Sequence, residues 1–205
     1  MAPGGRGNPY STYTLPIAEA PLQDTHISLA HGNGGRLMRE LIDGIFARRL
    51  GAGQLDTQVD AASIDLPAGR TLITTDGFTV QPLEFPGGDI GSLAVHGTCN
   101  DLAVAGARPR YLTLNAFIEE GLEVAVLDRL IESVARAARE SGVTVVAGDT
   151  KVVRRGECGG LYLATTGLGI APDRPLLGMS GIRPGDRILV SGPVGNHGVA
   201  VMLAR

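Results

Sequence analysis

The feature that most restricts the fold is an amphipathic helix pattern followed at once by a buried-strand pattern. Apolar residues recur at helical spacing along residues 127–138, and Gly142 follows where a helix-ending glycine is expected. Residues 143–147 (VTVVA) form a short apolar run rich in β-branched side chains, which predicts a buried strand. A helix and a strand of this kind bury their apolar sides against each other, so we predict a domain of mixed α and β class.

Other helix and strand patterns alternate along the chain. Extended or strand patterns cover residues 26–30, 71–74, 111–118 and about 161–170. Helix patterns cover residues 37–46, with Gly51 just past the end, and residues 90–102, with Asp89 as the N-cap.

Composition divides the chain into three parts. Residues 1–25 are rich in Gly, Pro and Ser and lack periodicity, so we predict a disordered tail. Residues 26–172 hold the patterns described above and form the predicted domain. A Pro-rich connection at residues 172–184 predicts a boundary, and residues 173–205 read as a linker and the beginning of a second domain. This last part includes a predicted strand at 187–191 and a helix from His197.

Charge and cysteine content exclude several classes of protein. The chain carries 18 basic and 21 acidic residues, a net charge of −3, which does not suit a general nucleic-acid binder. The sequence has no apolar stretch of about 20 residues and no secretory signal pattern. Two cysteines are too few for a disulfide framework or a four-thiolate zinc site. We therefore predict a cytoplasmic globular protein.

The first polar segment without an evident folding role is residues 31–35 (HGNGG). Successive small residues before a helix can present a nest of backbone N–H groups, which suits phosphate. The segment lacks the Lys-Ser/Thr of a P-loop and the glycine spacing of a dinucleotide fingerprint. A plain flexible loop explains these residues equally well.

Three aspartates form the second candidate group. Asp76 follows a predicted strand in the turn at residues 75–77, Asp101 lies within a predicted helix, and Asp149 follows the strand at 143–147. Carboxylates suit Mg²⁺, which prefers oxygen ligands and substrate phosphates. Taken singly, each aspartate also fits a turn residue or a hydrogen-bonded exception.

The third candidate is residues 148–151 (GDTK), which contain the only lysine of a chain with 17 arginines. A lysine ammonium is a compact charge that can contact phosphate or carry a proton. Because Lys151 follows Asp149 by two positions, an extended backbone would project both side chains to the same face. The alternative is an ordinary surface lysine.

Together these segments resemble the HypE family of hydrogenase maturation factors. The motifs that carry the resemblance are, in order, residues 31–35 (HGNGG), 74–76 (TTD), 85–91 (FPGGDIG), 100–103 (NDLA), 148–153 (GDTKVV) and 191–198 (SGPVGNHG). The resemblance extends from about residue 26 to residue 205. It also places the chain in the wider superfamily of the aminoimidazole ribonucleotide synthetase, selenophosphate synthetase and thiamine-monophosphate kinase families.

The resemblance implies an α+β, PurM-like N-terminal domain that binds ATP and Mg²⁺ and pairs through its sheet with a second copy, with the nucleotide site at that interface. HypE proteins use ATP to dehydrate a carbamoylated C-terminal cysteine to a thiocyanate, which supplies the cyanide ligand of the iron in NiFe hydrogenase. HypF supplies the carbamoyl group, and a HypC–HypD complex receives the cyanide.

The resemblance also implies roles for individual residues. Lys151 is the candidate catalytic or phosphate-contacting residue. The implied metal ligands are Asp76, Asp101 and Asp149. The implied nucleotide contacts are Gly32, Asn33, Gly34, Gly35, Asp76, Asn100, Gly148 and Thr150. The lack of proline in residues 111–118 also agrees with a strand that takes part in homodimer formation.

The sequence departs from the family at two points. The C-terminal tail with its cysteine and most of the second domain are not in the sequence, so we expect a fragment or truncated form that folds and pairs but does not complete the reaction alone. Glu84 stands where the family pattern leads us to expect an aromatic residue. Two other functions stay open: a small-molecule kinase or synthetase of the same superfamily, and a non-catalytic dimerisation module that binds maturation partners.

Overall fold

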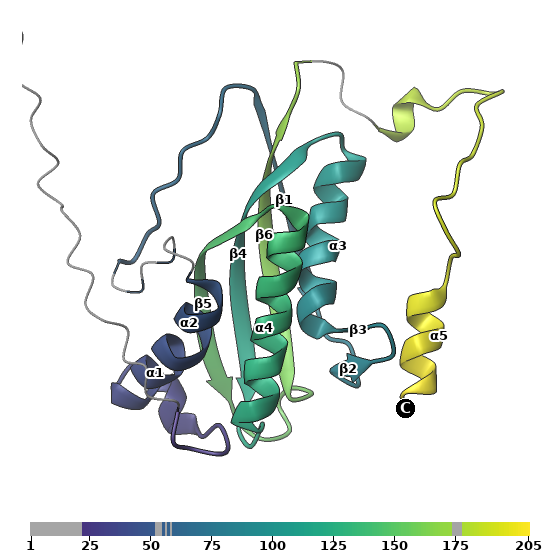
Figure 1. The fold of residues 1–205 in the computed structure, drawn as a ribbon. Helices are drawn as coiled ribbons and strands as arrows, with labels where there is room; N and C mark the ends of the chain where they lie inside the picture. The colour runs from purple at the N-terminus through teal and green to yellow at the C-terminus, as the bar shows by residue number, and fades with distance from the viewer. Residues whose placement is uncertain (1–21, 52–54, 56, 58, 174–177) are drawn as a thin grey trace, which may run out of the picture.

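The centre of the protein is a four-stranded mixed sheet. The computed structural model describes residues 22–51, 55, 57, 59–173 and 178–205. The sheet consists of β1 (Arg70–Phe78), β6 (Leu161–Ala171), β4 (Arg108–Glu119) and β5 (Thr144–Val153), in that spatial order (Figure 1). β6 pairs antiparallel with both β1 and β4, and β5 pairs parallel with β4. The mixed α and β class predicted from the sequence is confirmed.

Two long helices lie on one face of this sheet (Figure 1). α3 (Ile90–Val104) begins at Asp89, whose carboxylate accepts a hydrogen bond from the Ser92 amide at 2.9 Å. α4 (Val124–Ser141) ends at Gly142 in the left-handed conformation, with φ 66°. Both helix ends are those predicted from the sequence.

Shorter elements surround the sheet and the two long helices. At the edge near β5, the chain forms α1 (Arg36–Leu41), a π-helical turn (Ile42–Ala47) and α2 (Arg48–Leu50), which continue one another. A hairpin of β2 (Glu84–Phe85) and β3 (Gly88–Asp89) leads into α3. The remaining elements are the 3-10 turns η1 (Leu29–Gly32) and η3 (Met179–Gly181) and the helix α5 (Asn196–Leu203).

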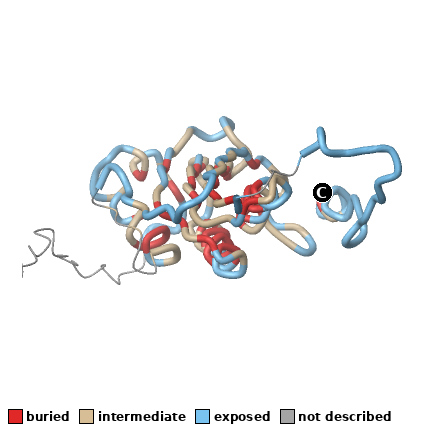
Figure 2. The backbone as a smooth tube through the Cα atoms, turned by 90° about the horizontal axis from the view of Figure 1, so that it is seen from above, coloured by how far each residue is buried: buried red, intermediate tan, exposed pale blue. Residues whose placement is uncertain are grey.

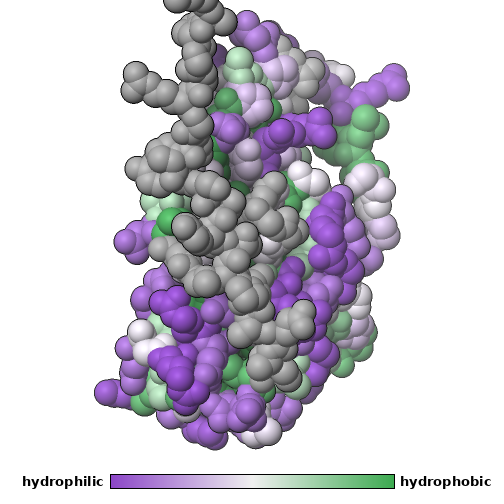
Figure 3. Space-filling model, turned by 60° about the vertical axis from the view of Figure 1, so that its left-hand side comes forward, coloured by the Kyte–Doolittle hydropathy of each residue, from purple (hydrophilic) through white to green (hydrophobic). Residues whose placement is uncertain are grey.

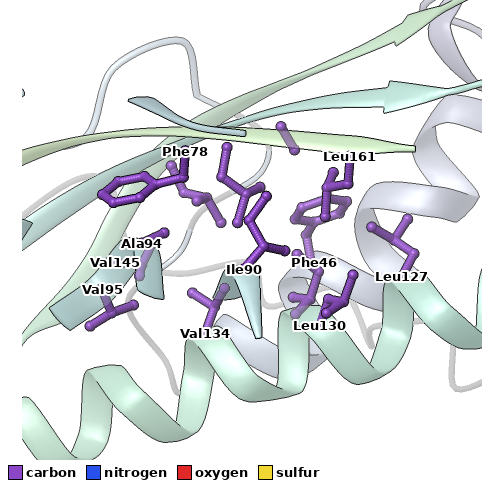
Figure 4. Close-up of a cluster of buried hydrophobic side chains, with 14 of the residues drawn as sticks. Phe46, Phe78, Ile90, Ala94, Val95, Leu127, Leu130, Val134, Val145 and Leu161 are labelled. Atoms are coloured by element: carbon purple, nitrogen blue, oxygen red, sulfur yellow. The ribbon is translucent and has the colours of Figure 1, made fainter. Parts of the chain in front are cut away.

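The core lies between the sheet and the two long helices. Leu127 and Leu130 of α4, Ile90 of α3 and Leu161 of β6 are all at most 1% exposed, and they pack together in one cluster (Figure 4). Burying side chains of this size stabilises the fold by roughly 1.5–3 kcal/mol each. Figure 2 shows the buried residues gathered in this body, whereas residues 178–205 are exposed along almost their whole length.

The two faces of the sheet differ. Along β6 the residues from Leu161 to Ala171 alternate between buried and half-buried. The buried set faces α3 and α4, and we call this side the helix face; the other side is the open face. The same alternation along β4 places Leu114 on the helix face and Phe117, 39% exposed, on the open face. Each candidate site residue that lies on a strand can therefore be assigned to a face.

Several local predictions were wrong. Residues 75–77 and 148–151 lie inside β1 and β5 rather than in loops, because pairing with β6 and β4 continues through them. Residues 187–191 form no strand, and they pair with no other strand among the described residues; Ile188 is 92% exposed. Gly51 has φ −75° and is not a left-handed helix end.

The folded part also begins before residue 26. The carbonyl of Thr25 accepts a hydrogen bond from the Val124 amide at 3.0 Å, and Leu22 packs against the core. Residues 1–21, also assigned to the tail by sequence, lie outside the described residues.

Apolar and hydrophilic residues are intermixed on the face of the molecule that Figure 3 shows. In the view of Figure 3, apolar residues form small groups between hydrophilic ones. Among the described residues, none of the helices has the length and apolar character needed to cross a membrane.

Candidate nucleotide and metal site

The glycine-rich segment lies directly against β5. A side chain at Gly32 would meet Val152 of β5, because a Cβ atom there would lie 3.0 Å from the Val152 Cβ. Gly34 has φ 75°, a conformation that favours glycine. The backbone of this segment is thus held beside the strand that carries residues 148–151.

A buried histidine fixes the start of the glycine-rich segment. His31 is fully buried, and its Nδ1 atom accepts a hydrogen bond from the Ser28 amide at 3.1 Å. Its Nε2 atom lies 3.3 Å from the Asp24 carboxylate. His31 therefore orders the turn Leu29–Gly32, and Gly34 and Gly35, beyond it, have open space where a side chain would project.

Lys151 and Asp149 form an ion pair on the open face. The Lys151 Nζ atom lies 2.8 Å from Asp149 Oδ2, and both side chains are more than half exposed. The parallel pairing of β5 with β4 sets Asp149 beside Asn115 and Lys151 beside Phe117. The expectation that these two side chains share a face is confirmed.

Asp76 and Asp101 lie together on the helix face, at the edge formed by β1. The Thr74 hydroxyl donates a hydrogen bond to Asp101 Oδ2 at 3.2 Å, which links α3 to β1. Asp76 is two residues further along the strand and about 7 Å from Thr74 along it. Both carboxylates are exposed, as is Asn100, next to Asp101 on α3.

The three aspartates do not converge within one chain. Asp76 and Asp149 lie on the two edge strands, which are about 14 Å apart at the normal spacing of strands, and on opposite faces. Accordingly, no group of three or more potential metal ligands occurs among the described residues. No local pattern in the sequence indicates this division, and the role of these residues as metal ligands stays a prediction.

The pair on the helix face fits a magnesium–nucleotide complex. Mg²⁺ is usually held by one or two carboxylates, with phosphate oxygens and waters completing its octahedral shell. Asp76 and Asp101 supply two exposed carboxylates of this kind, and the Thr74 hydroxyl orients one of them. They would hold the ion, and the ion would neutralise phosphate charge.

Gly148 and Thr150 lie on β5, next to Asp149 and Lys151 and at the opposite edge of the sheet from Asp76. Both belong to the helix face, because they pair in register with the buried Leu114 and Ala116 of β4. Thr150 is 6% exposed, and its Oγ1 atom is buried without a hydrogen-bond partner. The strand thus presents Thr150 to one face and Lys151 to the other.

Sequence reasoning missed Glu119, which fixes the loop after β5. Its carboxylate accepts hydrogen bonds from the amides of Gly156 and Gly160, and these bonds lower its pKa. In the same loop, burial raises the pKa of the Cys158 thiol, and the Glu119 charge raises it further. Cys158 is therefore kept as a thiol. No motif marks Glu119, because its partners are backbone amides.

The sheet with its two long helices, together with the glycine-rich segment and the charged residues described above, defines the class of protein. Residues 58–171 match the family described as "AIR synthase related protein, N-terminal domain". This match covers more than half of the chain, and the chain belongs to this family.

Within that class, the chain is similar to HypE proteins, as the motifs indicated. It is 52% identical over 191 residues to the carbamoyl dehydratase HypE of Azotobacter vinelandii, covering 92% of this chain and 55% of the relative. It is 42% identical over 185 residues to the carbamoyl dehydratase HypE of Escherichia coli, covering 88% and 55%. The chain spans about half the length of the curated relatives it matches.

Solved structures of HypE proteins are also similar to this chain. A hydrogenase maturation protein HypE in complex with ATP matches with a TM-score of 0.82 and 47% identity, covering 85% of this chain and 52% of that one. A HypE–HypF complex matches with a TM-score of 0.64 and 44% identity, covering 83% and 53%. The PurM-like fold expected from the resemblance is confirmed.

Proposed function

We propose that this chain is the ATP-binding and dimerising part of a HypE-type carbamoyl dehydratase that acts in NiFe-hydrogenase maturation. In that reaction ATP phosphorylates the oxygen of a cysteine-bound carbamoyl group, and loss of phosphate leaves a thiocyanate. HypF is the proposed carbamoyl donor and a HypC–HypD complex the proposed cyanide acceptor. One HypE protein was solved in complex with ATP, which supports the use of ATP. Another was solved in complex with HypF, which supports HypF as a partner.

The observation that carries the proposal is the position of the glycine-rich segment beside β5. Gly32 lies against Val152 on the helix face, and Lys151, the adjacent residue, projects to the open face at the same edge of the sheet. A phosphate chain that passes over this edge would contact backbone amides of the small residues and the ammonium. Lys151 would then contact phosphate or the reacting carbamoyl group.

The division of the aspartates supports a site shared by two copies of the chain. Asp76 and Asp101 lie at one edge and face of the sheet, and Asp149 lies at the other edge and face. A second copy packed on the open face would cover Ile73, 70% exposed, and Phe117. We therefore propose a homodimer in which the two groups of aspartates come from different copies.

Calorimetric titration of the protein with ATP and Mg²⁺ tests the proposal directly, and absence of binding would overturn it. A mixing experiment tests the shared site. Asp101→Asn and Asp149→Asn should each bind Mg²⁺–ATP weakly on their own. An equal mixture, after dissociation and reassembly, should regain about a quarter of the wild-type sites, because half of the dimers are mixed and each has one intact site.

A mixture that binds no better than the separate variants would show that the site does not take one residue from each copy. Normal binding by Asp149→Asn alone would remove Asp149 from the site.

A further inference from the structure

His31 opens the glycine-rich segment and is fully buried. A buried imidazole destabilises a fold unless its ring nitrogens find partners. Since the ring has no exposed surface, a phosphate bound at the surface does not contact it. Any effect of His31 on phosphate binding therefore passes through the backbone that the ring holds in place.

The Nδ1 atom of His31 closes the turn from which the glycine-rich segment continues. The Ser28 amide, just before the 3-10 turn Leu29–Gly32, donates a hydrogen bond to Nδ1 at 3.1 Å. In a typical capping box, a Glu or Gln three residues after the N-cap accepts this bond. An amide can only donate, so Nδ1 carries no proton, and in the neutral ring the proton is on Nε2. His31 thus accepts a backbone hydrogen bond in one defined tautomer.

The Nε2 atom of His31 is held less firmly. Asp24 Oδ2 lies 3.3 Å from it, but among the described residues no group forms a well-aligned hydrogen bond with Nε2. The Asp24 side chain is 51% exposed, so water competes for its carboxylate. The contact that fixes the ring is therefore the one to Ser28.

The backbone just after His31 offers an amide to a ligand. Gly32 lies against Val152 of β5, and Gly34 has open space where a side chain would project. The Gly34 amide donates to Met38 Sδ at 3.2 Å. A thioether sulfur is a weak acceptor, whereas a phosphate oxygen is charged and accepts much more strongly. The Gly34 amide can therefore pass from the sulfur to a phosphate oxygen with a net gain in free energy.

We propose that His31 is a positioning residue for the phosphates of the nucleotide. Its bond to Ser28 fixes the turn, the turn sets Gly32 against β5, and this arrangement directs the Gly34 amide toward the bound phosphates. The ring itself touches neither the nucleotide nor the reacting groups. The inference rests on the proposed ATP-binding function and adds the side chain that orders the phosphate contacts.

The test replaces His31 by leucine, which fills a similar volume without an acceptor, and by glutamine, which restores an acceptor three residues after Ser28. In calorimetry, His31→Leu should bind tripolyphosphate and Mg²⁺–ATP about tenfold more weakly than the wild type, since one hydrogen bond to the backbone is lost. His31→Gln should bind both within about threefold of the wild type. Adenosine, which has no phosphate, should bind all three proteins equally.

Thermal unfolding separates positioning from simple destabilisation. Both substitutions disturb a closely packed position, so both variants should melt below the wild type. Only His31→Leu should lose phosphate affinity. His26→Leu is the control, because His26 is exposed and lies before the turn, and this variant should bind tripolyphosphate normally.

A measurement on the wild type needs no substitution. Nitrogen NMR of the His31 imidazole, at a pH where the ring is neutral, should show the proton on Nε2. A proton on Nδ1 would exclude the hydrogen bond from the Ser28 amide and overturn the proposal.

Wild-type affinity of His31→Leu for tripolyphosphate would also overturn the positioning role. So would an equal loss of affinity in His31→Gln, because the acceptor would then not be what matters. An equal loss of adenosine affinity would do the same, since the effect would not concern the phosphates. A wild type that binds neither ATP nor tripolyphosphate would instead overturn the proposed function.

Discussion

The Lys151 Nζ atom lies 2.8 Å from Asp149 Oδ2, on the open face of an edge strand. The pair is exposed, so water screens it and it adds little to the stability of the fold. Breaking this ion pair therefore costs little free energy, and the Lys151 ammonium is available to bind another anion, such as a phosphate. This favours a role in which the ammonium contacts phosphate.

We expect Lys151→Ala and Lys151→Arg to bind ATP within about tenfold of the wild type, a difference of about 1.4 kcal/mol, but to form thiocyanate far more slowly. An arginine keeps the charge but not the compact geometry. The assay uses a full-length version of the protein that ends in the C-terminal cysteine implied by the family resemblance, with that cysteine carbamoylated. Arg154→Ala, next to the same strand, is the control and should keep its rate. Wild-type turnover by Lys151→Ala would show that Lys151 has no role in the reaction and that the single lysine reflects composition alone.

Asp101→Asn should lose most of the thermal stabilisation that ATP confers in the presence of Mg²⁺. A ligand at a hundred times its Kd stabilises a protein by about 2.7 kcal/mol, so the loss is measurable by thermal unfolding. The asparagine can still accept the Thr74 hydrogen bond, which leaves the link between α3 and β1 in place. Asp173→Asn, at an exposed position, should respond like the wild type. If Asp101→Asn also does so, Asp101 is structural.

The main helices and strands could be predicted from the sequence, because burial of one face makes apolar residues recur at the helix or strand spacing. The helical repeat of α4 and the apolar run at 143–147 are direct consequences of the core they share. The extent of β5 could not be predicted in this way. Gly148 and Asp149 have low strand propensity, and only pairing with β4 keeps them extended.

The arrangement of the site was predictable only in part. Lys151 and Asp149 are two residues apart, so strand alternation alone places them on one face. The separation of Asp76 from Asp149 depends on the strand order β1-β6-β4-β5, which no local pattern records. The unpaired hydroxyl of Thr150 likewise depends on what surrounds it in space and has no signature in the sequence.

Substitution of Ile73 by aspartate should convert the proposed dimer to a monomer. Ile73 is 70% exposed on the open face of β1, where a second copy would bury it. A carboxylate buried there without a partner opposes association strongly. Light scattering at micromolar concentration should give half the wild-type mass. Val104→Asp, at a position 72% exposed at the end of α3, is the matched control and should leave the mass unchanged. A monomeric wild type would contradict the dimer itself.

The ion pair between α2 and α4 should make stability depend on pH. Arg49 donates two hydrogen bonds to Asp128, at 2.6 and 2.9 Å, and these bonds hold the pKa of the Asp128 carboxyl below its usual range. Since the pKa is lower in the folded than in the unfolded state, the charged carboxylate stabilises the fold above the unfolded pKa of about 3.9. This contribution is lost as the pH falls through the folded pKa.

Asp128→Asn should therefore be less stable than the wild type by about 1–2 kcal/mol at pH 7, and this difference should shrink as the pH falls below about 4. Urea unfolding at pH 7, 5, 4 and 3 measures it. Glu140→Gln, at an exposed position on the same helix, is the control and should track the wild type throughout. A difference between Asp128→Asn and the wild type that stays constant over this range would mean that Asp128 acts through packing and not through its charge.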